Sequence, residues 1–113
     1  MESQLDHEKN RVKQRNRIAE LMPGLMKGVA GVTAKAYQDG ALSCKVKRLM
    51  ALALALGVGC KNCILSQTVE AMENGATTEE VLETLSVVTS MRGTTGVGES
   101  LRVIQLLDEL GKL

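Results

Sequence analysis

Aromatic residues are almost absent from this chain. Its 113 residues contain no Trp and no Phe, and Tyr37 is the only Tyr. A core without large rings must be built from aliphatic side chains and Met, which suits closely packed helices but leaves a small domain short of buried surface. We therefore expect one domain whose subunits share part of their core in a homo-oligomer.

A large charge excess and long apolar runs are also missing. The formal net charge is +1, and no basic stripe interleaved with aromatics occurs, so nucleic acid is not an expected partner. The longest apolar run, LMALALALGVGC, is shorter than the about 20 residues that span a bilayer. The charged N-terminus has no signal-peptide core. We expect a cytoplasmic protein with no membrane partner.

Cysteine is scarce, but two of the three cysteines lie close together. Cys60 and Cys63 form a C-x-x-C pair in GCKNCILSQ, whereas Cys44 stands alone and is expected to pack in the core. Two thiolates and one remote histidine, His7, fall short of the four ligands of a zinc site. In a reducing compartment such a pair is typically redox-active or metal-binding. A metal site would need ligands from another subunit and is the less expected alternative, so neither a metal nor a bound cofactor is predicted.

Helical periodicity covers most of the chain. Residues 5–21 carry a narrow apolar stripe on a charged segment, which is typical of an arm that docks on a neighbour. Pro23 suits the first turn of a second helix that should run to about Asp39 and stop at Gly40 in a left-handed cap. Ser43 then suits the N-cap of an almost wholly apolar helix.

The second half of the chain reads as helices too. Gly59 should end the apolar helix, and the cysteines should open the next. A capping-box pattern starts a fifth helix at Thr77, and GTTGVG (93–98) reads as a flexible break before a last helix. The predicted fold class is all-α, with about six helices: a polar arm in residues 1–22 and one domain in residues 23–113.

Four short segments occur in an order and spacing far more specific than a bare C-x-x-C. They are DGALS (39–43), KVKRL (45–49), GCKNC (59–63) and NGATTEEVLETL (74–85). In this order they resemble the carboxymuconolactone decarboxylase family, specifically its alkyl hydroperoxidase D-like branch. The resemblance implies an all-α domain that assembles as trimers or hexamers, and a peroxiredoxin-type antioxidant activity.

The chain departs from the pattern of that branch at three positions. The branch carries a Glu twelve residues before the first cysteine and a His four residues after the second, where this chain has Arg48 and Gln67. A further His, often found between the cysteines, is Asn62 here. The proton relay that the resemblance implies is therefore absent. The decarboxylase branch usually lacks the cysteine pair, so lactone decarboxylation is not expected.

The residues that are present favour electrostatic activation of the cysteines. A helix start stabilises a thiolate at Cys60 or Cys63, and Arg48 would add positive charge. Gln67 lies on the same helix face and can donate a hydrogen bond, but it cannot take a proton. Glu70 could serve as a base, although an exposed helix glutamate is the expected reading. That Arg48 and its neighbouring lysines are ordinary solvated charges stays open.

Two functions follow, and the sequence leaves both open. In the first, Cys60 and Cys63 cycle between dithiol and disulfide, reduce a small peroxide or disulfide, and are re-reduced by a lipoyl or thioredoxin-like dithiol. Disulfide exchange needs only a thiolate and a good leaving group, whereas peroxide reduction also needs a donor for the leaving oxygen. In the second, the chain is a catalytically silent oligomeric member with structural cysteines.

Overall fold

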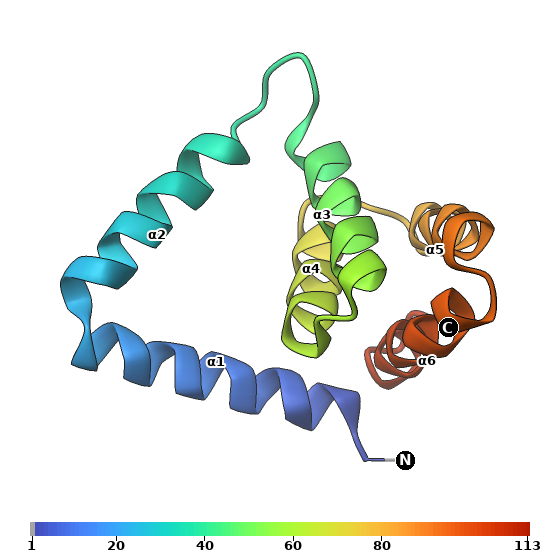
Figure 1. The fold of residues 1–113 in the computed structure, drawn as a ribbon, viewed down its shortest axis with the longest axis horizontal. Coiled ribbons are helices and arrows are strands. Elements are labelled where there is room, and N and C mark those ends of the chain that lie inside the picture. The colour runs from blue at the N-terminus through green and yellow to red at the C-terminus, as the bar shows by residue number, and fades with distance from the viewer. Residues whose placement is uncertain (1) are drawn as a thin grey trace.

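The chain folds into six α-helices in the computed structural model, which describes residues 2–113. They are α1 (Gln4–Leu21), α2 (Pro23–Ala36), α3 (Cys44–Val58), α4 (Lys61–Glu73), α5 (Thr78–Arg92) and α6 (Thr94–Glu109). No strand occurs in these residues, so the all-α prediction is confirmed. In Figure 1, α3 and α4 lie side by side, α5 and α6 follow on one flank, and α1 and α2 form an angled pair outside this group.

Helix ends follow the sequence signals at three places. The Ser43 hydroxyl accepts the backbone N–H of Val46 at 3.2 Å and caps α3. That helix ends at Gly59, whose φ of +76° favours glycine. At α5, Thr77 and Glu80 form the expected reciprocal capping box.

Two boundary predictions are wrong. The second helix ends at Ala36 with Tyr37 as its cap, and Gly40 does not adopt a left-handed conformation. The segment 93–98 is not a flexible break, because only Gly93 turns the chain, with φ of +63°, and α6 begins at the next residue. Gly96 serves close packing instead, since a Cβ there would lie 3.1 Å from the carbonyl oxygen of Val88 on α5.

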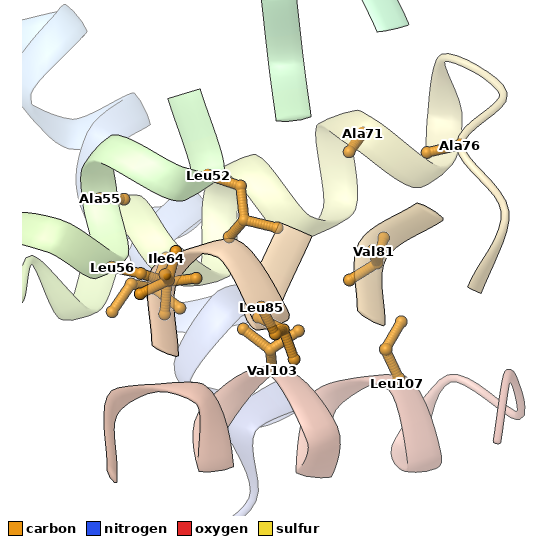
Figure 2. Close-up of a cluster of buried hydrophobic side chains, with 11 residues drawn as sticks. Leu52, Ala55, Leu56, Ile64, Ala71, Ala76, Val81, Leu85, Val103 and Leu107 are labelled. Carbon is orange, nitrogen blue, oxygen red and sulfur yellow. The ribbon is translucent and has the colours of Figure 1, made fainter. Parts of the chain in front are cut away.

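The hydrophobic core lies between α3, α4, α5 and α6. Figure 2 shows side chains from these four helices and from the turn before α5 gathered into one cluster: Leu52, Ala55, Leu56, Ile64, Ala71, Ala76, Val81, Leu85, Val103 and Leu107. Several are completely buried, so aliphatic packing alone closes this core. Within residues 2–113, no helix is both long and apolar enough to cross a bilayer.

The first two helices pack very differently from the other four. The Glu109 carboxylate on α6 accepts the backbone N–H groups of Gln4 and Leu5 at 2.8 and 2.9 Å, and thereby caps the start of α1. The start of the arm thus docks on its own chain. No residue of α2 is buried, and its helix contacts are with α1.

Candidate redox site

The turn between α3 and α4 places both cysteines at a helix start. Cys60 is the N-cap of α4, and its sulfur accepts the backbone N–H of Cys63 at 3.3 Å. The two residues are joined in a disulfide, with their Cα atoms 5.2 Å apart. When the pair is reduced, the unpaired N–H groups of the first turn stabilise a thiolate here. The C-x-x-C spacing therefore brings the two sulfurs together at the start of α4.

A cavity of about 360 Å³ lies beside one of the two sulfurs. It is formed between α1 and α4, and Cys63, Ser66 and Gln67 are among its lining residues. Cys63 is exposed, whereas Cys60 is only partly exposed. A small molecule that enters this cavity therefore meets Cys63 first.

Arg48 is turned toward α4 and is largely shielded, with its side chain 13% exposed. Its Nη1 donates to Oε1 of Gln67 at 3.2 Å, and its Nη2 lies 3.7 Å from Oε2 of Glu70. The guanidinium also stacks on Tyr37, with Cζ 3.6 Å from the ring centroid. Among the described contacts, Arg48 makes no hydrogen bond to either sulfur. The guanidinium instead forms an ion pair with Glu70 and a cation–π contact with Tyr37.

The contact with Arg48 decides how Gln67 is oriented. A guanidinium has only donors, so the amide atom that faces it must be the oxygen. The NH₂ group of Gln67 is then left to face elsewhere, and Gln67 also lines the cavity beside Cys63. At the position where the related branch has a histidine, this chain offers a hydrogen-bond donor that does not titrate.

The other candidates lie outside this arrangement or differ from expectation. Glu70 is not a freely exposed glutamate, because it pairs with Arg48. Cys44 does not pack in the core: it is partly exposed, and its thiol donates to Oδ1 of Asn74 at 3.3 Å. Asn62 is exposed and lines the cavity.

Two of the neighbouring lysines are engaged away from the sulfurs. Lys45 pairs with Glu80 at 2.9 Å, and the ammonium of Lys47 donates to the carbonyl oxygen of Gln38 at 2.6 Å. The described residues contain no group of three or more His, Cys, Asp and Glu side chains placed to hold a metal ion.

Sequence reasoning missed two groups at the site. Arg11 and Arg15 of α1 line the cavity opposite the cysteine, and Tyr37 covers Arg48. The sequence signals on α1 were its basic character and its apolar stripe. The buried residues of this helix are Gln4 and Glu8, so the stripe does not mark the side that packs on the chain.

Comparison with known proteins establishes the family. The family model described as carboxymuconolactone decarboxylase family matches residues 23–106, and the chain therefore belongs to this family. Its Cys60–Cys63 pair fits the C-x-x-C, alkyl hydroperoxidase D-like branch.

Relatives and solved structures agree with this assignment. The chain is 34% identical over 93 residues, 82% of each chain, to an uncharacterised protein of Cupriavidus necator. The apo structure of a carboxymuconolactone decarboxylase family protein from Legionella pneumophila is similar with a TM-score of 0.89 and 31% identity, covering 98% of this chain and 100% of that one. A family protein of Thermotoga maritima, described as having a possible part in the antioxidative response, gives a TM-score of 0.80 and 26% identity over 90% of each chain.

Proposed function

We propose that this protein is a dithiol–disulfide oxidoreductase that acts through Cys60 and Cys63. The observation that carries the proposal is the pair itself: two cysteines at disulfide distance on a helix start, one of them exposed in a cavity. A purely structural disulfide would gain nothing from a sulfur that a small molecule can reach. The description of the Thermotoga maritima relative supports an antioxidant role.

The order of attack follows from access. In the reduced protein the Cys63 thiolate attacks one sulfur of a disulfide R–S–S–R, the S–S bond breaks, and R–S⁻ leaves. Cys60, whose thiolate is stabilised by the helix start, then attacks the Cys63 sulfur of the mixed disulfide and expels the second R–S⁻. Two electrons pass to the substrate. An external dithiol of the lipoyl or thioredoxin-like class returns them by the same steps in reverse.

Reduction of a peroxide uses the same pair and one more residue. The Cys63 thiolate attacks one oxygen of R–O–O–H, the O–O bond breaks, and R–O⁻ leaves and takes a proton from water. The resulting Cys63 sulfenic acid is attacked by Cys60, which releases water and forms the disulfide. The NH₂ group of Gln67, oriented by Arg48, is the donor for the leaving oxygen. Because this donor supplies no proton, peroxide reduction should be slower than disulfide exchange.

Trapping the first intermediate tests the function. Cys60→Ser should form a stable mixed disulfide at Cys63 when treated with a small disulfide. Cys63→Ser should form the corresponding mixed disulfide at Cys60 much more slowly. Cys44→Ser is the matched control and should keep full turnover. In the unaltered protein the pair should have a reduction potential of about −200 to −300 mV, within the range of cytosolic partners. A pair that stays oxidised well below that range would mean a silent family member and would overturn the proposal.

Replacing Gln67 separates the two substrates. Gln67→Leu removes the amide donor and should lower the peroxide rate constant by about tenfold, while the disulfide rate constant changes by less than about twofold because no oxygen leaves in that reaction. Equal losses with both substrates would show that Gln67 only supports the local packing.

Two unpartnered apolar surfaces support assembly into a homo-oligomer, for which a trimer or hexamer is the expected size. One is an apolar groove of about 480 Å³ between α3 and α5, where exposed side chains include Leu54, Val58, Val87 and Met91. The other is the α2 stripe, defined by Leu25, Val29 and Val32, all exposed.

The overall size of the chain agrees with an uncovered α2. The radius of gyration, 14.3 Å, exceeds the about 13 Å of a compact chain of this length, because the first two helices stand away from the core. Burial of the α2 stripe on another copy would remove this exposed apolar surface from water.

A further inference from the structure

The cavity beside Cys63 has an uneven charge. Its wall on α1 carries Arg11 and Arg15, and its wall on α4 carries the amides of Asn62 and Gln67 next to the sulfur. None of the described residues that line it is acidic. A molecule bound against Cys63 therefore meets cationic, neutral hydrogen-bonding and apolar groups, Ile18 among the last, but no carboxylate of these lining residues.

The two arginines differ in whether a carboxylate of the chain pairs with the guanidinium. Arg11 is held by Glu8 in a bidentate contact, with Nε–Oε1 and Nη2–Oε2 distances of 2.6 and 2.9 Å, and this hydrogen bonding raises the pKa of Arg11. Arg15 is exposed, and among the described residues no carboxylate or carbonyl is hydrogen-bonded to it. Of the two arginines in this wall, Arg15 is thus the one whose charge is not offset by a contact within residues 2–113.

We propose that this cavity selects small disulfides that carry a carboxylate, with Arg15 binding the carboxylate while Cys63 attacks the disulfide sulfur. A volume of about 360 Å³ lies at the lower end of small-molecule sites, which fits a low-molecular-weight substrate and not a folded partner. The inference rests on the proposed dithiol function and adds the substrate's charge to it. A planar guanidinium suits a carboxylate because it can donate two parallel hydrogen bonds.

The arginine takes no part in the bond changes. The Cys63 thiolate forms a bond to one substrate sulfur, the substrate S–S bond breaks, and a carboxylated thiolate leaves. Cys60 then expels the second carboxylated thiolate and closes the protein disulfide, so that two electrons have moved to the substrate. Arg15 lowers the free energy of binding and of approach for an anion, and raises it for a cation.

Three small disulfides that differ in charge test this inference. They are 3,3′-dithiodipropionate with two carboxylates, 2-hydroxyethyl disulfide with none, and cystamine with two ammonium groups. Each is mixed with the reduced full-length protein, and loss of free thiols is followed at low salt. The quantity compared is the rate constant for dithiodipropionate divided by that for cystamine. The intrinsic reactivity of each disulfide is the same for every variant, so it cancels when this ratio is compared between variants.

The chain offers a matched control two residues along the same helix. Arg15→Gln should lower the ratio by at least about fivefold, because the loss of one unit charge at about 4 Å in water slows the anion by about that factor and also removes the repulsion that slows cystamine. Arg15→Glu should lower the ratio further. Arg17→Gln removes the same charge, but Arg17 lines a different cavity, so its ratio should stay within about twofold of the unaltered protein. Salt at about 1 M should lower the ratio of the unaltered protein toward that of Arg15→Gln.

The outcomes separate this inference from the function on which it rests. If all three disulfides oxidise the pair but the ratio is the same in the unaltered protein, Arg15→Gln and Arg17→Gln, the charge selection is wrong and the dithiol function stands. If no disulfide oxidises the pair, both are wrong. Because Arg15 is exposed and Gln is a good helix former, circular dichroism should show an unchanged fold.

Discussion

Helices α2 and α3 are nearly equal in length and both rich in apolar residues, yet α3 is buried in the core and α2 is not. α3 has 15 residues and buries Leu52, Ala55 and Leu56, whereas α2 has 14 residues and buries none. Most of the difference lies in the neighbours, because α3 is surrounded by α4, α5 and α6 while α2 touches α1. Apolar content indicates that a helix needs a partner, and only packing shows whether the partner lies in the same chain.

The largest expected difference between the two helices is in the free energy of unfolding when an aliphatic side chain is removed from each. Leu52→Ala should lower the free energy of unfolding by about 2–5 kcal/mol, because Leu52 is completely buried and leaves a cavity. Val32→Ala should change it by less than about 0.5 kcal/mol in dilute protein, because Val32 is 72% exposed. Urea denaturation at low protein concentration measures both. Equal losses would mean that α2 packs on its own chain.

A charge placed on the α2 stripe should prevent assembly without unfolding the chain. Val32→Glu would bury a carboxylate in the proposed subunit interface, so the mass measured by light scattering should fall toward that of one chain. Ala34→Glu is the matched control, because it adds the same charge on the opposite face of α2, and its mass should stay unchanged. If Val32→Glu keeps the mass of the unaltered protein, α2 does not form the interface.

A smaller effect is expected at the start of α5. Thr77→Ala removes the hydroxyl that accepts the N–H of Glu80 and should cost about 1 kcal/mol of stability. Thr77→Ser keeps the hydroxyl and should recover most of this loss in thermal unfolding. Failure of serine to recover stability would mean that the threonine methyl group matters more than the cap. No such cap is available to α2, whose first residue follows Met22 without a side-chain hydrogen bond.

The smallest effect concerns the ion pair that joins α3 to α5. The hydrogen bond from Lys45 and the backbone N–H of Thr77 hold the pKa of Glu80 below its ordinary value of 4.5. A lowered pKa in the folded state gives stability that is present above about pH 4.5 and is lost as the pH falls through the lower folded value. Glu80→Gln should therefore melt below the unaltered protein at pH 7, and the gap should close toward pH 3.

Glu79→Gln provides the control for this pH dependence. It removes a charge from the same helical turn but does not touch Lys45 or the Thr77 hydroxyl. Its melting temperature should follow that of the unaltered protein more closely across this range. A gap that is the same at pH 3 and pH 7 for Glu80→Gln would contradict the ion pair as its source.

Local signals in the chain were sufficient for the helices and for the cysteine turn. Ser43, Gly59 and Thr77 each act within a few residues, through a side-chain cap or an allowed positive φ, and each behaves as its residue type indicates. The error at Gly96 has a different origin. The prediction treats a helical glycine as a source of flexibility, but Gly96 is required by close contact with Val88 and Thr89 at the end of α5. That contact depends on how the turn at Gly93 folds α6 back against α5, which residue type alone does not indicate.

The candidate site divides in the same way. Cys60, Cys63 and Gln67 could be placed on one helix face from their spacing alone, because helix geometry is local. The direction of Arg48 could not, since it depends on Tyr37 from one segment and Glu70 from another. The arginines of α1 were missed for the same reason.

The amino-acid order alone determined the all-α class, most helix ends and the C-x-x-C pair at the start of α4, because these depend on interactions between residues a few positions apart. Tertiary structure decided that α1 lies over the cysteines with Arg15 in the cavity, that Arg48 holds the oxygen of Gln67, and that α2 stays uncovered. These three facts depend on which faces of distant helices meet. That choice is made by the burial of the whole core, and no single segment contains it.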